Sequence, residues 1–205
     1  MTESQGKTFW ELTRYEHVPQ SPQKLGLPQP PLELPIDPAA PRISLPDPRS
    51  MSTPSIDLWQ AINRRRTVRN YAPTPLSLDE LSLLLWSTQG VREVSARPVT
   101  LRTVPSAGAR HAFETYILVN TVEGLEPGIY RYAAVEHALL PYNLAEDVNS
   151  RFTAACLDQS QVANSAVTFA WAVVMERMYW RYTERGYRYI LLDAGHVCQN
   201  LYLAA

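Results

Sequence analysis

Four arginines and one hydroxyl side chain lie together in the stretch Arg64-Arg65-Arg66-Thr67-Val68-Arg69. Guanidinium groups bind phosphate through forked, charge-assisted hydrogen bonds, and a nearby hydroxyl adds another donor. The cluster therefore predicts a site for a phosphate dianion, where each shielded hydrogen bond contributes about 1.5–3 kcal/mol. A solvated basic face or a nucleic-acid patch remains the alternative on composition alone. The rest of the sequence does not extend the basic patch, which counts against nucleic acid.

Two further segments have residue types that suit chemistry. The small-residue loop Pro105-Ser106-Ala107-Gly108-Ala109 could let backbone N–H groups approach a flat ligand, although such loops are also common turns. Arginines and tyrosines alternate between Arg177 and Tyr189. A tyrosine beside a guanidinium could donate a proton or stabilise negative charge, and cation–π packing at the surface is the alternative.

Composition limits the class of protein. Of the 205 residues, 45% are hydrophobic and 19% are charged, so a sizeable core is expected and a wholly disordered chain is excluded. The net charge of −1 argues against a general nucleic-acid binder or a polybasic membrane protein. Neither GxGxxG nor GxxxxGK[ST] occurs, and no cysteine or histidine pair has zinc-ligand spacing, so no metal site is predicted. With two cysteines and no secretory signal, we expect a soluble cytoplasmic protein.

Proline divides the chain into two parts. Most of the 17 prolines fall between Pro19 and Pro54, where they disfavour a long helix or a central strand. Apolar residues recur between them, which favours an extended arm over residues 1–54 that lies on a folded surface; a flexible linker is the alternative. Residues 55–205 are then expected to form the folded domain.

Hydrophobic periodicity and capping residues predict the elements of that domain. Their order, helices interleaved with few strands, favours an α+β sandwich over a doubly wound sheet. In chain order they are a helix capped by Ser55, a helix begun by the capping box 77–80 and stopped by Gly90, a strand at 116–119, a hairpin of 128–132 with 137–142, a helix at 146–157, a strand at 167–175 buried on both faces, and a long helix at 189–205.

Taken in order, these segments resemble the nitroreductase superfamily and, within it, the SagB/ThcOx-type branch of azoline (thiazole/oxazole) dehydrogenases. The resemblance spans nearly the whole chain. The matching pieces are Phe9–Tyr15, Ile43–Pro46, Arg65–Arg69, Pro75–Gly90, Arg102–Arg110, Gly124–Tyr132, Arg185–Tyr189 and Gly195–Ala205.

The resemblance implies an FMN-dependent oxidoreductase with a nitroreductase-like sandwich, in which helices flank a central, mostly antiparallel sheet. It implies a homodimer with flavin at the interface, and a peptide substrate with partner enzymes of a biosynthetic pathway. The net charge of −1, not the resemblance, is the reason that no nucleic-acid or membrane partner is expected. In the azoline branch, a base removes a proton and N5 of FMN accepts a hydride as a thiazoline or oxazoline becomes a thiazole or oxazole. By position, the expected cofactor-binding residues are Arg65, Arg66, Thr67 and Arg69 at the phosphate, and Pro105, Ser106, Ala107 and Gly108 at the isoalloxazine, usually from the partner subunit.

The sequence departs from the family pattern at two places. The usual Lys-Tyr pair is Arg181-Tyr182 here, and an arginine stays protonated, so it cannot serve as a general base. Tyr182, with Arg181 beside it, remains the expected catalytic pair. The family's usual C-terminal segment, which contacts the flavin, is expected to be lacking after Ala205. Two other functions therefore stay open: an NAD(P)H-dependent nitro- or quinone reductase, and a non-catalytic dimerising remnant.

Overall fold

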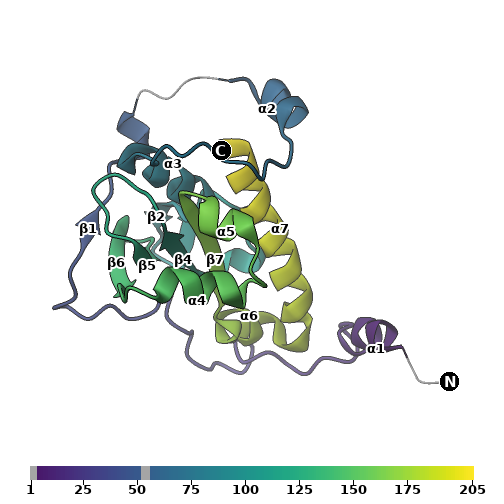
Figure 1. The fold of residues 1–205 in the computed structure, drawn as a ribbon. Helices are drawn as coiled ribbons and strands as arrows, with labels where there is room; N and C mark the ends of the chain where they lie inside the picture. Colours follow the sequence, from purple (N-terminus) through teal and green to yellow (C-terminus); the bar gives the residue numbers. More distant parts are fainter. Residues whose placement is uncertain (1–3, 52–55) are drawn as a thin grey trace.

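The computed structural model describes residues 4–51 and 56–205. Its central element is a five-stranded sheet in the order β1-β6-β5-β4-β7, in which every neighbouring pair is antiparallel. Helices flank this sheet, so the expected α+β sandwich with an antiparallel sheet is confirmed (Figure 1). A separate two-stranded sheet pairs β2 (Val91–Val94) with β3 (Thr100–Arg102).

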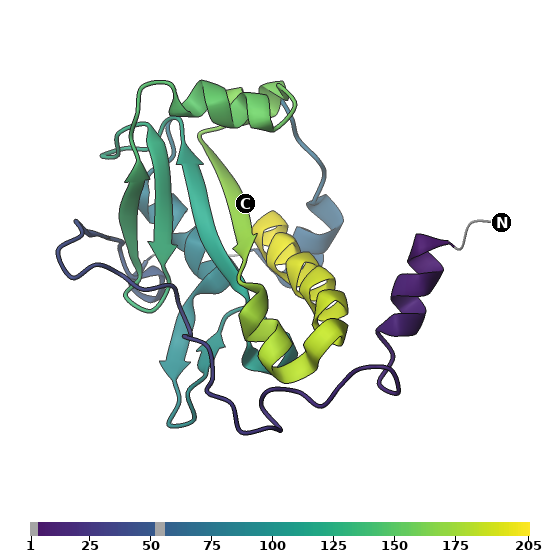
Figure 2. The same cartoon turned by 90° about the horizontal axis from the view of Figure 1, so that it is seen from below.

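One face of the sheet carries helices α3 (Leu78–Gln89) and α7 (Gly186–Ala204). Phe113 and Ile117 of β4 (Phe113–Val119) point to the same face, because side chains alternate along a strand. Ile117 packs in a cluster with leucines of α3, whereas Phe113 packs with residues of α6 and α7. The core therefore consists of two clusters of buried residues, and Figure 2 shows α7 beside β7.

Helix α3 begins and ends where its sequence predicts. The Ser77 hydroxyl accepts the Glu80 N–H at 3.2 Å, and the Glu80 carboxylate accepts the Ser77 N–H at 2.8 Å, which completes the capping box. Gly90 follows as the C-cap. The predicted apolar face is buried in the core, as its members Leu81, Leu84, Leu85 and Thr88 show.

The predicted hairpin is also confirmed. Strand β5 (Gly128–Ala133) pairs with β6 (Ala138–Asn143), and β5 also pairs with β4, which contains the predicted strand at 116–119. Tyr130 and Tyr132 share one face and are almost fully buried against α3. Helix α4 (Val148–Ala155) lies within the range predicted for it, and α5 (Ser160–Asn164) leads into the last strand.

The expectation for the last strand was wrong in one respect. Strand β7 (Val167–Val173) pairs only with β4, so it is an edge strand, and it is only partly covered. The continuous apolar run at 167–175 therefore does not mark a strand buried on both faces. The run is also split between two elements, because helix α6 (Met175–Tyr182) begins two residues after β7 ends.

Two helix starts differ from the sequence prediction. Helix α2 (Leu58–Arg64) is capped by Asp57, whose carboxylate accepts the Gln60 N–H at 3.0 Å. The predicted cap, Ser55, lies outside the described residues. An acidic side chain immediately before the first helical residue takes this role, since it accepts from the third helical N–H. Helix α7 begins at Gly186, three residues before the predicted start, after the 3₁₀ turn η3 (Thr183–Arg185).

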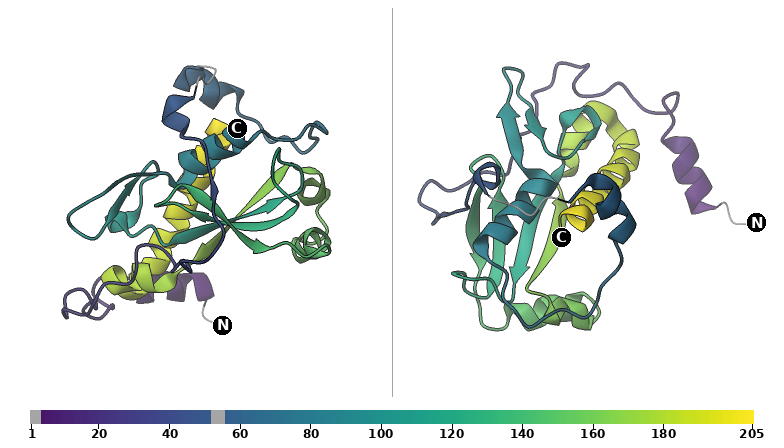
Figure 3. Two further views of the ribbon diagram at one scale, coloured as in Figure 1. Left: turned by 90° about the vertical axis from the view of Figure 1, so that its left-hand side faces the viewer. Right: turned by 90° about the horizontal axis from the view of Figure 1, so that it is seen from above.

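The proline-rich segment lies along the folded surface, as the arm interpretation predicts (Figures 2 and 3). Within it are α1 (Gln5–Leu12), β1 (Ile43–Ser44) and the turn η1 (Pro48–Ser50). Guanidinium groups of the rest of the chain hold the arm by its carbonyl oxygens: Arg177 donates to Pro31 at 2.8 Å, and Arg131 to Pro35 at 3.1 Å.

Buried charge fixes the same part of the arm. The Glu114 carboxylate of β4 accepts the Leu34 N–H at 2.9 Å and forms a 2.5 Å ion pair with Arg177. Both side chains of this pair are at most 4% exposed.

No helix within residues 4–51 and 56–205 is long and apolar enough to cross a bilayer.

Candidate functional site

A single carboxylate fixes the small-residue loop to the long helix α7. Asp193, which is 3% exposed, accepts the Ser106 hydroxyl at 2.6 Å and the Ala107 N–H at 3.2 Å. The Ser106 oxygen in turn accepts the His111 N–H at 2.9 Å. Burial raises the pKa of Asp193, and the two hydrogen bonds that it accepts oppose that rise. The loop therefore has a fixed position relative to the core.

The loop meets the expected catalytic pair at Gly108. This residue starts a left-handed turn, with φ of +58°, inside the 3₁₀ segment η2 (Ala107–Ala109). A Cβ atom at this position would lie 2.6 Å from Nε of Arg181 and 2.6 Å from the hydroxyl oxygen of Tyr182. Only glycine permits both the turn and this close approach. The structure thus brings together two of the segments that the sequence singled out.

Arg110 completes this cluster, and the sequence reasoning gave it no role. Its Nε donates to the Gly108 carbonyl at 2.9 Å, and its guanidinium lies 5.2 Å from the centre of the Trp180 ring. Burial and the neighbouring charge of Arg181 lower the pKa of Arg110. Two guanidiniums therefore flank the Gly108–Tyr182 contact. In the sequence, Arg110 is recognisable only as the last residue of the family-like segment Arg102–Arg110. Its hydrogen-bond partner, the Gly108 carbonyl, is known only from the fold.

His111 adds no positive charge beside this cluster. It is 5% exposed, and burial together with the charge of Arg102 lowers its pKa to about 3. The imidazole is consequently neutral near pH 7. Positive charge at the site comes from Arg110 and Arg181, a setting that can stabilise negative charge on a ligand.

The predicted phosphate-binding residues directly follow helix α2, at the helix exit that the sequence predicted. Their side chains are exposed, so their donors are accessible to a ligand; they are Arg65, Arg66, Thr67 and Arg69. A hydrogen bond with Cys198 raises the pKa of Tyr202, and the charge of Arg65 opposes this rise, which places Arg65 near the C-terminal end of α7. Figure 3 shows α2 beside that end of the helix.

The phosphate-binding candidates and the small-residue loop therefore lie beside different parts of helix α7. Asp193 holds the loop near the middle of α7, and Tyr202 is nine residues further on, which corresponds to about 14 Å of helix. Among the described residues, no hydrogen bond joins the two groups directly. Within the same residues, no three histidine, cysteine or acidic side chains come close enough to hold a metal ion.

The family model described as the nitroreductase family matches residues 62–205 of this chain. The chain belongs to the nitroreductase family. Its assignment to the superfamily is therefore confirmed, and the family makes it an oxidoreductase.

Relatives among curated protein sequences agree with this nitroreductase assignment. A nitroreductase-type protein of Methanocaldococcus jannaschii is 37% identical over 163 residues, which are 80% of this chain and 77% of that protein. The trifolitoxin-processing protein TfxB of Rhizobium leguminosarum bv. trifolii is 33% identical over 65% of this chain, and TfxF is 27% identical over 74% of it. This chain spans 38% of TfxB and 53% of TfxF. Both relatives fit the SagB/ThcOx-type branch.

Solved structures show the same nitroreductase fold. A nitroreductase-type structure from Anabaena variabilis has a TM-score of 0.64 and 28% identity, covering 82% of this chain and 34% of that one. One from Ralstonia eutropha has a TM-score of 0.62 and 24% identity, with coverage of 87% and 75%. A chain of the McbBCD microcin synthetase complex of E. coli has a TM-score of 0.54 and 22% identity, covering 77% of this chain and 61% of that one.

Proposed function

We propose that this nitroreductase-family chain is an FMN-dependent oxidoreductase that dehydrogenates azoline rings in a peptide natural product. The observation that carries the proposal is the contact of Gly108 with Arg181 and Tyr182, flanked by Arg110. It combines a small-residue loop with a phenol in a positively charged setting. The names of the trifolitoxin-processing relatives support a peptide substrate.

The chemistry of the donor set fits FMN. Arg65, Arg66 and Arg69 with the Thr67 hydroxyl offer exposed, forked donors that suit a dianionic phosphate. The loop, held by Asp193, has no bulky side chain that would block a flat ring. Bound FMN would supply the acceptor for two electrons and a proton, as flavins do.

The chain's own residues would then bind, orient and move the proton. The arginines hold the phosphate, and the loop fixes the plane of the ring. Tyr182 is proposed to act as the phenolate, whose oxygen takes the proton from the substrate ring and becomes a neutral phenol, because Arg181 stays protonated and cannot take it. Arg110 and Arg181 would stabilise the phenolate charge that is present before this transfer; the Arg181 guanidinium lies 5.6 Å from the centre of the Tyr182 ring.

A homodimer is part of the proposal, because several large apolar side chains on two helices are uncovered in the single chain. On α2 and α7, large apolar side chains are more than half exposed; they are Leu58, Trp59, Ile62, Leu191 and Leu192. Grouped exposed apolar side chains are typical of protein–protein contacts. A partner copy would cover α2 next to the proposed phosphate site.

A second function is favoured by one specific observation. This chain covers 77% of the length of the Methanocaldococcus relative, about twice the 38% of TfxB that it covers. The name of that relative is that of a nitroreductase. A reductase that takes electrons from NAD(P)H is therefore the second candidate. Both activities reduce the flavin, and they differ in the electron donor: an azoline in one and a nicotinamide in the other.

The test begins with the visible spectrum of the purified chain, followed by heat release and identification of any flavin. We expect FMN, and we expect Arg65→Ala to retain at least tenfold less of it in a titration, equivalent to about 1.4 kcal/mol. Arg92→Ala, which removes an exposed arginine of β2, is the matched control. Unchanged FMN affinity in Arg65→Ala would overturn the phosphate assignment.

Substrate tests then separate the activities. A synthetic thiazoline peptide should lose two hydrogens under air, detected by mass spectrometry. Rapid bleaching of the flavin by NAD(P)H without thiazoline oxidation would favour the nitro- or quinone reductase. A folded dimer that stays colourless with added FMN would identify a non-catalytic remnant.

A further inference from the structure

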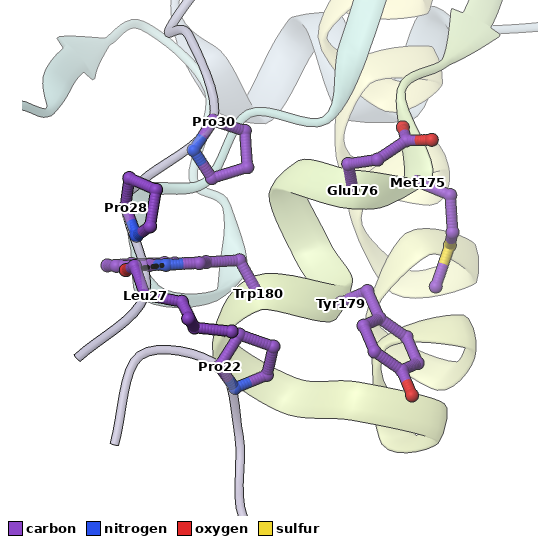
Figure 4. A pocket seen from close by; sticks show the side chains of 8 residues that line it. All are labelled: Pro22, Leu27, Pro28, Pro30, Met175, Glu176, Tyr179 and Trp180. Atoms are coloured by element: carbon purple, nitrogen blue, oxygen red, sulfur yellow. Dashed lines mark hydrogen bonds between the residues drawn. The ribbon is translucent and has the colours of Figure 1, made fainter. Parts of the chain in front are cut away.

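A pocket of about 520 Å³ that is largely open to solvent, called the cavity below, lies between the arm and helix α6. Figure 4 shows its side chains facing one another from two segments that are far apart in the sequence. Glu176 is the only charged residue among them; the others are apolar or aromatic. The lining consists of Pro22, Leu27, Pro28, Pro30, Met175, Glu176, Tyr179 and Trp180.

The two walls of this cavity are fastened to each other. The Trp180 indole N–H donates to the Leu27 carbonyl at 2.9 Å, and the Gln23 N–H donates to the Trp180 carbonyl at 2.9 Å. The prolines of the arm restrict its backbone further. The cavity is therefore preformed, and a ligand would not need to order the arm in order to bind.

The cavity adjoins the proposed active site. Trp180 directly precedes Arg181, and Arg110 joins the Trp180 ring, 5.2 Å away, to the Gly108 carbonyl. Arg181 also donates to the Gln23 side chain of the arm at 3.4 Å. The wall of the cavity and the loop of the proposed flavin site are thus linked through Trp180 and Arg110.

We propose that this cavity binds a bulky apolar side chain of the peptide substrate, close to the residue that reacts; this rests on the function proposed above. Its volume lies within the usual 300–1,000 Å³ of ligand pockets and accommodates an aromatic side chain. The lining offers aromatic and proline surfaces that such a side chain would cover. Glu176 at the edge favours a basic residue next to the apolar one, by charge complementarity.

Binding is tested on the full chain with two labelled peptides of equal length. Both carry a thiazoline ring; one has Lys-Phe before the ring and the other has Lys-Ser. Fluorescence anisotropy should give a Kd for the phenylalanine peptide at least tenfold lower than for the serine peptide. Equal Kd values would overturn the proposal.

Two leucines of the arm give matched variants. Leu27 lines the cavity and Leu25 does not, while their exposed fractions are 53% and 58%. We expect Leu27→Ala to bind the phenylalanine peptide about three- to tenfold more weakly and the serine peptide as before. Leu25→Ala should bind both as the parent does. An equal loss in the two variants would contradict the assignment, and Tyr179→Ala repeats the test from the opposite wall if Leu27→Ala does not fold.

FMN content and thiazoline oxidation on the same preparations separate this inference from the proposed function. A chain that prefers the phenylalanine peptide but does not oxidise it supports the cavity and refutes azoline dehydrogenation. A chain that oxidises both peptides with the same KM refutes only the cavity. With the parent chain, a peptide with lysine before the phenylalanine should have a lower Kd than one with norleucine at that position. Glu176→Gln should reduce this difference in Kd.

Discussion

Removing the carboxylate of Asp193 should destabilise the protein and release the loop that we place against the flavin. Asp193→Ala removes the partner of the Ser106 hydroxyl and of the Ala107 N–H, at 2.6 Å and 3.2 Å. Hydrogen bonds to a charged group contribute about 1.5–3 kcal/mol each. The cost of burying the carboxylate, visible in its raised pKa, offsets part of this. A net loss of about 2–3 kcal/mol in unfolding free energy follows.

Thermal and urea unfolding measure that loss. For a chain of this size, about 2–3 kcal/mol corresponds to a fall in Tm of roughly 4–12 °C. Asp193→Asn is the control, because its side-chain oxygen can still accept the Ala107 N–H; it should lose about 1 kcal/mol. FMN affinity should fall in the order parent, Asn, Ala. If the alanine variant unfolds within about 0.5 kcal/mol of the parent and binds FMN equally well, Asp193 does not hold the loop.

Two further variants test the buried charges. Glu114→Gln should lose about 3–5 kcal/mol in urea unfolding, because it leaves the guanidinium of Arg177 buried without its counter-charge. Glu136→Gln breaks only the half-exposed pair with Arg42 and should lose at most about 1 kcal/mol, so equal losses in the two variants would contradict this account. His111 has a pKa of about 3 in the folded protein against an unfolded value near 6.5, so stability is full above pH 6.5 and falls as the pH drops toward 3. Over the steep part of that range we expect the unfolding free energy to fall by about 1.4 kcal/mol per pH unit. His111→Asn should remove this pH dependence, as measured by urea unfolding at several pH values. An unchanged slope in that variant would show that His111 is not its source.

Elements set by neighbouring residues were predictable from the sequence. The capping box at Ser77 involves groups three residues apart, so its pattern is complete in the sequence. The hairpin of β5 and β6 follows from alternating apolar residues on adjacent strands. The proline spacing in the arm likewise predicts an extended segment, since each proline restricts its own backbone.

The prediction was wrong where a local pattern fits two tertiary settings. The apolar run at 167–175 is typical of a strand buried on both faces, yet β7 lies at the edge of the sheet. Which strand is at an edge depends on the order in which the chain places all five strands, and apolar content does not encode that order. Helix α2 shows a smaller ambiguity, because several residues before it could act as caps and Asp57 is the one beside the first turn.

The residues of the proposed site were named from the sequence, but their arrangement was decided by the tertiary structure. Composition and spacing gave the arginine cluster, the small-residue loop and the alternating arginines and tyrosines between Arg177 and Tyr189; the family resemblance then singled out Arg181 and Tyr182. Only the fold brings Gly108 against that pair, because the link between Ser106 and Asp193 spans 87 residues. The same holds for the arm, which Arg177 holds at Pro31 from 146 residues away. Such contacts form when the chain folds back on itself, and hydrophobic burial, which has no residue-to-residue code, drives that folding.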